Sequence, residues 1–200
     1  MSAPEQVVDE VVHMLNTRGQ GDYIGEAISQ LQHSLQAAHL AAVSHAQDKV
    51  VIAALLHDIG HFLPLQEASR LAGEIKDMHN EADNTSVGRI GHERIGELYL
   101  LHKGFSPDIA ALVGSHVAAK RFLCAVEPAY HDTLSDASKK SLIFQGGPMN
   151  AEEVKQWSAQ PWCADMCRLR KWDDAAKVPE LVVPAAESYR DMLLRSLLSS

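Results

Sequence analysis

A histidine and an aspartate stand side by side in this sequence, as His57 and Asp58, directly after an apolar run and before Gly60. The run covers residues 50–56 without a polar side chain, so a helix there would be buried on every side. A buried carboxylate is costly unless it is paired, because its charge loses the stabilisation of water. A metal ion would satisfy both side chains, and the two oxygens of Asp58 could bind two ions. A helix-end carboxylate beside a core histidine is the alternative, but the flanking apolar helix and glycine favour a metal site.

The chain holds eleven histidines, and several of them, with one aspartate, lie on apolar faces of expected helices. Each of these side chains is three, four or seven residues from apolar ones, a spacing that points it into the core with them. Each one alone is more often a core residue than a ligand. Together with the His-Asp pair they indicate one shared metal centre. The candidates are His33, His92, His116 and Asp173.

His79 is an alternative to His92 as a ligand. It lies in a polar stretch that has no apolar stripe, whereas His92 opens an expected helix. The sequence therefore favours His92.

Two cations follow the same spacing rule. Lys120 is four residues after His116, and Arg170 is three residues before Asp173, so each projects beside an expected ligand. Such cations would hold an anionic substrate, Arg through its planar guanidinium and Lys as a point charge. The alternative is that both lie at the surface.

The elements that must position these residues are helices, because apolar residues recur at helical spacing and no run alternates as a strand would. We expect an all-α chain in a single domain, residues 1–200, in which Pro, Gly and many charges make residues 63–88 a mobile loop insertion. The expected helices cover residues 4–18, 26–47, 49–57, 91–103, 107 onward, 134–144, 151 onward, 162–177 and 184–198.

The composition excludes several classes of protein. A net charge of −8 argues against a general binder of nucleic acid or of acidic membranes. The acidic N-terminal stretch lacks the regions of a signal peptide, and we find no apolar run near the roughly 20 residues of a membrane span. Three cysteines argue against a disulfide framework. We expect a cytoplasmic protein, and the sequence sets no oligomeric state.

The order of the candidate ligands resembles that of the HD-domain superfamily, and in detail that of the mixed-valent diiron oxygenases with their phosphonate-cleaving members. The similarity spans nearly the whole chain. The segments that carry it are residues 22–27 (DYIGEA), 53–58 (AALLHD), 114–121 (GSHVAAKR), 134–138 (LSDAS), 145–149 (QGGPM) and 169–174 (LRKWDD).

The resemblance implies an HD-domain helical bundle with two iron ions, Fe(II) and Fe(III), in its core and O2 as co-substrate. It also favours Asp173 over Asp165 and Asp174, and it matches the 24-residue spacing from His92 to His116. The segment from Asp58 to His92 is longer than in the phosphonate-cleaving members, which leaves the role of residues 63–88 open. One ion would be held by His33, His57, Asp58 and Asp173, and the other by His92, His116 and the shared Asp58.

The same resemblance assigns further residues to the substrate. His61 and Ser138 would contact the phosphonate together with the two cations. Tyr23 and Glu26 would form a gating pair, in which Tyr23 occupies an iron position until substrate displaces it and Glu26 faces the amino end of the substrate.

The function implied is O2-dependent cleavage of the C–P bond of a small-molecule 1-hydroxyphosphonate. We lean to (R)-1-hydroxy-2-(trimethylammonio)ethylphosphonate, which gives glycine betaine and phosphate. The close variant is 2-amino-1-hydroxyethylphosphonate, which gives glycine and phosphate. An HD-type metal-dependent phosphohydrolase is the first alternative. A non-catalytic HD-like signalling module is the second, but it would have lost ligands, and this chain has all six.

Overall fold

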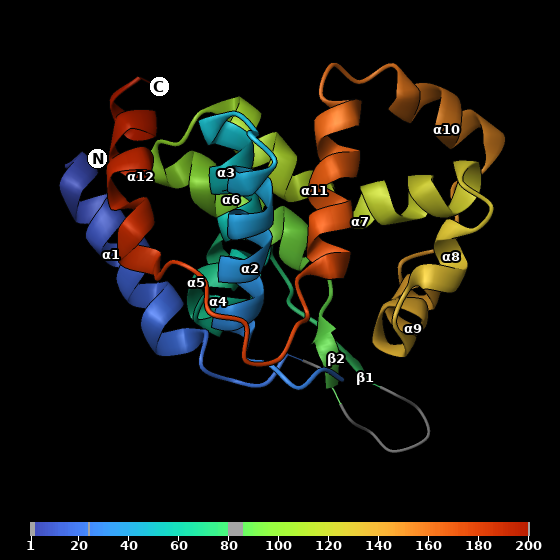
Figure 1. Cartoon of the computed structure of the whole chain (residues 1–200), viewed down its shortest axis with the longest axis horizontal. Coiled ribbons are helices and arrows are strands. Elements are labelled where there is room, and N and C mark those ends of the chain that lie inside the picture. The colour runs from blue at the N-terminus through green and yellow to red at the C-terminus, as the bar shows by residue number, and fades with distance from the viewer. Residues whose placement is uncertain (1–2, 24, 80–85, 200) are drawn as a thin grey trace.

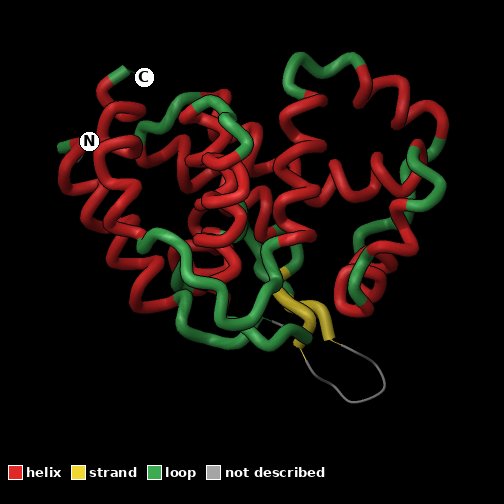
Figure 2. The backbone as a smooth tube through the Cα atoms, viewed as in Figure 1, coloured by secondary structure: helices red, strands yellow, loops and turns green. Residues whose placement is uncertain are grey.

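The computed structural model describes residues 3–23, 25–79 and 86–199, which fold almost entirely into helices (Figures 1 and 2). The all-α prediction is confirmed for these residues, apart from one short pair of strands. The elements are α1 (Pro4–Arg18), α2 (Gln30–Val43), α3 (Asp48–Leu56), α4 (Ile59–Phe62), α5 (Leu65–Ala72), β1 (Asp77–His79), β2 (Ser86–Arg89), α6 (His92–Lys103), α7 (Pro107–Val126), α8 (Tyr130–Thr133), α9 (Asp136–Phe144), α10 (Ala151–Ser158), α11 (Cys163–Ala175), a 3-10 turn (Ala186–Tyr189) and α12 (Arg190–Leu198).

Helix α3 lies at the centre of the main core. Its residues 50–56 are at most 1% exposed, as their unbroken apolar run predicts. Helices α2, α7, α11 and α12 pack against it, and α6 packs along α7. Helix α1 closes this core by packing on α12, so the two ends of the chain lie on one side of the molecule (Figure 1). The end of α3 is therefore a well-enclosed place for polar groups.

A smaller apolar cluster lies beyond the far end of α7. Leu123 from α7 meets Tyr130, Leu134 and Leu142 there. Helices α8, α9 and α10 lie together around that end in Figure 1. Helix α9, with Ser138 near its start, lies close to Lys120 of α7. The expectation of a single domain stays a prediction.

Residues 63–88 are not the irregular loop that we expected, where the structure describes them. Residues 65–72 form α5, which buries Ala68 against the core and ends at Gly73 with a left-handed φ of 82°. Strands β1 and β2 then pair antiparallel, with Asp77 opposite Arg89. The sequence pattern did not predict α5 because charged residues surround its apolar positions. Residues 80–85 lie outside the part of the chain that the structure describes.

Helix α2 begins four residues later than expected, at a capping box. The Ser29 hydroxyl accepts a hydrogen bond from Gln32 N, and Gln32 Oε1 accepts one from Ser29 N. Residues 22–23 and 25–29 lie in a turn before it, closed by hydrogen bonds from Tyr23 N to Ile28 O and from Glu26 N to Tyr23 O. We call these residues the Tyr23 turn. It projects the Tyr23 ring back towards α2.

Helix α7 is the one helix of the described chain that is long and apolar enough to span a membrane by length and composition, with a mean hydropathy of 1.5. We had expected no apolar segment of this kind. In the structure 56% of that stretch is buried inside the protein, and it carries His116 and Lys120. A central core helix passes the same test, because it too is apolar over its whole length.

Gly60 allows α4 to lie directly against the start of α6. A Cβ built on Gly60 would lie 2.0 Å from His92 O and 3.0 Å from Gly96 N. Both are backbone atoms, which cannot rotate away as a side chain would. The absence of a side chain at position 60 therefore brings the His-Asp pair within reach of His92.

We predict that Gly60→Ala lowers the free energy of unfolding by about 3 kcal/mol, because the added methyl group must push α6 away. The variant should also lose the metal ion that His92 would bind. Gly21→Ala is the matched control, because its Cβ would make only an ordinary contact, 3.6 Å from Gln30 Nε2. Urea unfolding and metal analysis measure both effects, and equal stability of the two variants would contradict the argument.

Candidate metal centre

The carboxylate of Asp58 lies between α3 and α4, in the middle of a cluster of imidazoles. The residue is 6% exposed, and the imidazoles around it are buried. Its two oxygens face different groups of ligands. The geometry of the site follows from this division.

The first group faces Oδ2 of Asp58. The Nε2 atoms of His33 and His57 lie 3.7 and 3.4 Å from this oxygen, and they lie 3.0 Å from each other. Oδ1 of Asp173 lies 3.2 Å from His33 Nε2 and 3.9 Å from His57 Nε2. Helices α2, α3 and α11 thus supply three converging side chains.

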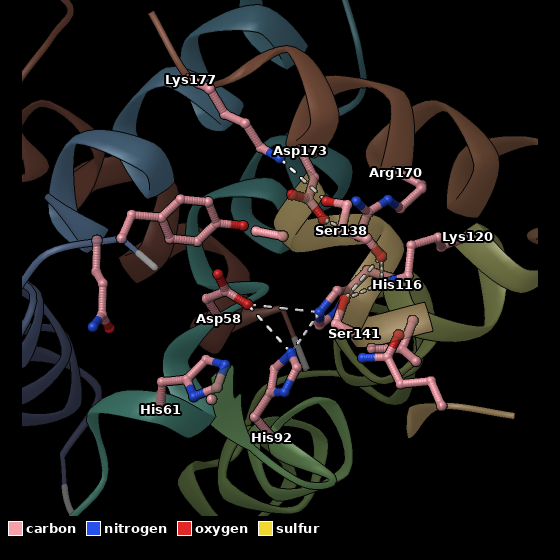
Figure 3. A pocket seen from close by; sticks show the side chains of 16 residues that line it. Asp58, His61, His92, His116, Lys120, Ser138, Ser141, Arg170, Asp173 and Lys177 are labelled. Atoms are coloured by element: carbon pink, nitrogen blue, oxygen red, sulfur yellow. Dashed lines mark hydrogen bonds and ion pairs between the residues drawn. The ribbon is translucent and has the colours of Figure 1, made fainter. Parts of the chain in front are cut away.

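The second group faces Oδ1 of Asp58. The Nε2 atoms of His92 and His116 lie 3.4 and 3.6 Å from this oxygen and 2.9 Å from each other. Figure 3 shows both rings pointing at Asp58 from α6 and α7. The structure therefore brings together all six residues that the sequence proposed as ligands, in two groups that share one carboxylate.

The other residues weighed as ligands lie differently. Asp174 is paired with Arg170 and hydrogen-bonded by Tyr130, and Asp165 is paired with Arg168. His79 lies in β1, and its side chain is outside what the structure describes.

Each of the four histidines is oriented by its other ring nitrogen. In every case Nδ1 lies 2.8–3.0 Å from a backbone carbonyl oxygen, to which it donates its proton. Nε2 is then left with a lone pair that points into the cluster, as a metal ligand requires. The carbonyls belong to Ala176 for His33, Ala54 for His57, Arg89 for His92 and Val113 for His116.

This arrangement fits two metal ions. Two lone pairs that face each other at 2.9–3.0 Å repel unless a cation lies between them. Two ligand atoms at right angles on one ion, each about 2.1 Å away, are about 3.0 Å apart. Asp173 Oδ1 is buried and accepts no hydrogen bond from the described residues, so a bound cation would satisfy this oxygen as well. The donor set of imidazoles and carboxylates suits iron, zinc or manganese.

The pKa shifts of Asp58 and His116 favour the protonation states of metal ligands. Burial alone would raise the pKa of Asp58, but the surrounding imidazoles, His57 first, hold this pKa below its ordinary value. Burial, helped by the nearby His92, lowers the pKa of His116 to about 3. A charged carboxylate and neutral imidazoles are the forms that bind metal.

A cavity of about 100 Å³ opens beside the two groups of ligands. Lys120 lines it, with Nζ 2.8 Å from Ser141 Oγ and 3.4 Å from Ser138 O. Burial, and then the nearby guanidinium of Arg170, lower the pKa of Lys120 to about 7. No carboxylate lies within ion-pair distance of this ammonium among the described residues, so it is available to an anion in the cavity.

Arg170 also lines the cavity, but it is not a free cation. Its Nη1 lies 2.6 Å from Asp173 Oδ2, and its other nitrogens bond Asp174. The spacing rule placed Arg170 on the correct face, yet it did not reveal these partners. Since Arg170 holds one oxygen of Asp173, the other oxygen is turned towards the histidines.

His61 differs from the four ligand histidines in its tautomer. Its Nδ1 lies 3.5 Å from Arg89 N, which donates to it, so the proton is on Nε2. Burial, followed by the nearby His92, lowers the pKa of His61 well below its ordinary value, and the ring stacks on His92 with centroids 4.0 Å apart. His61 therefore offers a donor to the cavity rather than a lone pair to a metal.

Tyr23 and Glu26 are near the site but play different parts in the geometry. The Tyr23 ring stacks on His33, with centroids 3.8 Å apart, and lines the cavity. Burial, and then the carboxylates of Asp173 and Asp58, raise the pKa of Tyr23 well above its ordinary value, so its phenol keeps its proton. Glu26 does not line the cavity; its Oε1 lies 3.4 Å from Lys177 Nζ.

Lys177 and Arg89 are site residues that sequence reasoning missed. Lys177 lines the cavity four residues after Asp173, the spacing that identified Lys120, but it lies beyond the end of α11. Arg89 donates to Gly60 O and Leu63 O, and so fixes α4 beside β2. No local sequence pattern predicts the role of Arg89, because its hydrogen-bond partners are about 30 residues away.

A helical bundle with a buried His-Asp pair at a metal centre defines a class of protein. The chain matches the HD domain family over residues 31–135, just over half of its length.

Relatives of known name narrow this class. The chain is 38% identical to the hydroxymethylphosphonate dioxygenase of Gimesia maris over 93% of this chain and 86% of that protein. It is 32% identical to the glycine-betaine-forming [1-hydroxy-2-(trimethylamino)ethyl]phosphonate dioxygenase of Leisingera caerulea, over 94% and 89%. It is also 34% identical to the uncharacterised protein L432 of Acanthamoeba polyphaga mimivirus, over 98% and 84%. The chain therefore belongs to the HD-domain oxygenases.

We predict that Asp58→Ala abolishes binding of both ions, since its carboxylate is the one ligand that the two groups share. His92→Ala should remove about one ion per chain and leave the group around His33 filled. Metal content after desalting measures both effects. His79→Ala serves as the control, and loss of an ion from that variant while His92→Ala keeps two would contradict the assignment.

Proposed function

We propose that this oxygenase uses two iron ions, Fe(II) and Fe(III), and O2 to cleave the C–P bond of a 1-hydroxyphosphonate. The observation that carries the proposal is the divided carboxylate of Asp58, with two ligand groups beside a cavity lined by cations. The products would be a carboxylic acid and phosphate, so that both atoms of O2 enter the products. The ions, when bound, would supply a site for O2 and a path for electrons from the substrate to O2, which no side chain of the chain offers.

The residues of the chain would bind and orient the substrate. Lys120 and the Nε2–H of His61 face the cavity as donors to phosphonate oxygens. Ser138 adds a hydroxyl on the α9 side. Donors from three separate helices fix one orientation of a tetrahedral anion, which places its hydroxyl-bearing carbon at the metal centre.

The charge at Glu26 bears on the choice of substrate. We expected this carboxylate to attract a cationic nitrogen, but its ion pair with Lys177 offsets that charge. Asp58 and Asp173, which do line the cavity, face the metal ligands. These contacts, and the higher identity to the Gimesia maris protein, favour hydroxymethylphosphonate over the trimethylammonio compound that the sequence favoured.

The function is tested on protein purified without oxygen and analysed for iron, followed by assays of O2 uptake and phosphate release. Equal consumption of O2 and release of phosphate from hydroxymethylphosphonate is the expected result. The trimethylammonio and 2-amino compounds should react at least tenfold less well in kcat/KM. Release of phosphate from phosphomonoesters without O2 would instead support a phosphohydrolase.

The pKa of Lys120 gives a prediction for the pH dependence. Because this pKa is about 7, the Lys120 side chain is charged below pH 7 and loses its charge as the pH rises above 7. Arg keeps its charge throughout this range. The kcat/KM of the wild type relative to Lys120→Arg should therefore fall by about tenfold from pH 6 to pH 8.

Dividing by the Lys120→Arg value removes the ionisation of the substrate, which is common to both proteins. Lys120→Met should be slower than either at every pH. A constant ratio between wild type and Lys120→Arg would show that the ammonium of Lys120 does not act on the substrate.

A further inference from the structure

Residues 176–178 follow α11 directly and lie against α2, and Figure 1 shows the chain leaving the end of α11 there. We call them the post-α11 segment. The carbonyl oxygen of Ala176 accepts a hydrogen bond of 2.9 Å from His33 Nδ1. Lys177, the next residue, lines the cavity with its Nζ 3.3 Å from Ser138 Oγ. A metal ligand and a cation of the cavity therefore both depend on where this segment lies.

Gln36 of α2 holds the backbone of the post-α11 segment at Val178. Its Nε2 donates a hydrogen bond of 2.8 Å to Val178 O, and its Oε1 accepts one of 3.0 Å from Val178 N. Gln36 is 1% exposed, whereas Val178 is 48% exposed. The segment is thus anchored by the peptide groups of Val178 rather than by its side chain. Gln36 lies three residues after His33, so both side chains leave the same face of α2.

The direction of the Ala176 carbonyl depends on a tight turn at the end of α11. Ala176 has φ −80° and ψ 49°, close to an inverse γ-turn, and Lys177 N donates to Ala175 O over 2.9 Å. The C=O and N–H of a trans peptide point in opposite directions. The carbonyl of Ala176 is therefore turned away from Ala175 and towards His33. Gln36 holds the peptide that comes next, which keeps this one from rotating.

The other contacts of the segment do not set this direction. Ala176 is fully buried, but its methyl group packs in the same way whichever direction the following carbonyl takes. The bonds of Lys177 to Ser135 and Ser138 are made at the end of a long side chain, which can adjust to a moved backbone. The two hydrogen bonds of Gln36 act on the backbone itself.

We propose that Gln36 is a positioning residue for the ion that His33, His57 and Asp173 would bind. By holding both peptide groups of Val178, it keeps Ala176 O where it accepts the proton of His33 Nδ1. His33 then keeps the lone pair of Nε2 turned towards the ion. This inference goes beyond the proposed function, because it concerns the metal centre and holds whichever reaction that centre carries out.

The test is zinc binding by Gln36→Met, which keeps the length of the side chain and removes the amide. Protein loaded with two zinc ions is titrated with a chelator, while imidazole 15N spectra follow each ligand histidine. The dissociation constant of the ion on the His33 side should rise at least tenfold, as for the loss of other groups that orient a ligand histidine. The ion held by His92 and His116 should change by less than threefold. Equal weakening of both ions, or zinc binding as in the wild type, would overturn the proposal.

Two control variants separate positioning from stability. Val178→Ala removes an exposed side chain and keeps both backbone hydrogen bonds, so it should bind zinc as the wild type does. Ser106→Ala removes the cap of α7, far from the post-α11 segment. It should lower the stability of the fold without distinguishing between the two ions. Selective loss of the His33-side ion in Ser106→Ala would show that this effect follows from stability alone, and would refute the role of Gln36.

A measurement on the wild type needs no substitution. If Gln36 and His33 hold one segment, a single opening breaks both contacts. Hydrogen exchange of His33 Nδ1–H and of Val178 N–H in the zinc-loaded protein should therefore give opening constants that agree within about threefold. The Nδ1–H of His57, bonded to Ala54 O three residues earlier, should open at least tenfold less often. Opening of Val178 at least tenfold more often than His33 would show that the contacts are independent, and would refute the coupling.

These measurements use zinc, which has no redox chemistry, so they do not depend on turnover. Absence of O2 uptake with every hydroxyphosphonate would refute the proposed reaction and leave the zinc result unchanged. An active oxygenase whose Gln36→Met variant holds both zinc ions normally would refute the positioning role alone.

Discussion

The rest of the site depends on one carboxylate, which lies between two pairs of imidazoles. Asp58 divides its oxygens between His33 and His57 on one side and His92 and His116 on the other. A buried negative charge among neutral rings is unfavourable unless cations join it. The helices that surround it are therefore arranged to hold metal, with the lone pairs of each pair of imidazoles turned towards one place.

The fold contributes to this centre mainly through backbone atoms. Four carbonyl oxygens fix the tautomers of the ligand histidines, and those of Ala54, Val113 and Ala176 belong to residues of the hydrophobic core. His57 and His116 bond carbonyls three residues earlier in their own helices, so their orientation is local. His33 depends on Ala176, 143 residues away, and its tautomer is set only when α11 docks on α2. The orientation of His57 and His116 is thus set by nearby residues, and that of His33 by a contact between distant parts of the chain.

This difference explains how much the sequence could predict. The six ligand candidates followed from apolar spacing and an adjacent His-Asp pair, which are local signals, and the family resemblance decided for Asp173 over Asp165 and Asp174. Helix boundaries were close where a cap marks them, as at Ser106, and too early at α2, where Ser29 is the cap. Residues 63–88 were mistaken for a loop because a short helix among many charges gives a weak pattern. The roles of Arg89 and Lys177 and the partners of Arg170 could not be predicted, since each depends on contacts between elements or just past a helix end.

The charges around the cavity show why these missed contacts matter. Arg170 pairs with Asp173 and Asp174, and Lys177 pairs with Glu26, whereas Asp58 and Lys120 complete the set of charges around the cavity. Three cations against four carboxylates leave the side chains alone slightly negative, in keeping with a chain whose net charge is −8. Bound metal ions reverse that sign, so the centre as a whole attracts an anion only once it is loaded. Arg170 and Lys177 are occupied by carboxylates, whereas Lys120 has none beside it. Lys120 is therefore the cation that an anion in the cavity would meet without a carboxylate partner, whereas Lys177 is already paired with Glu26.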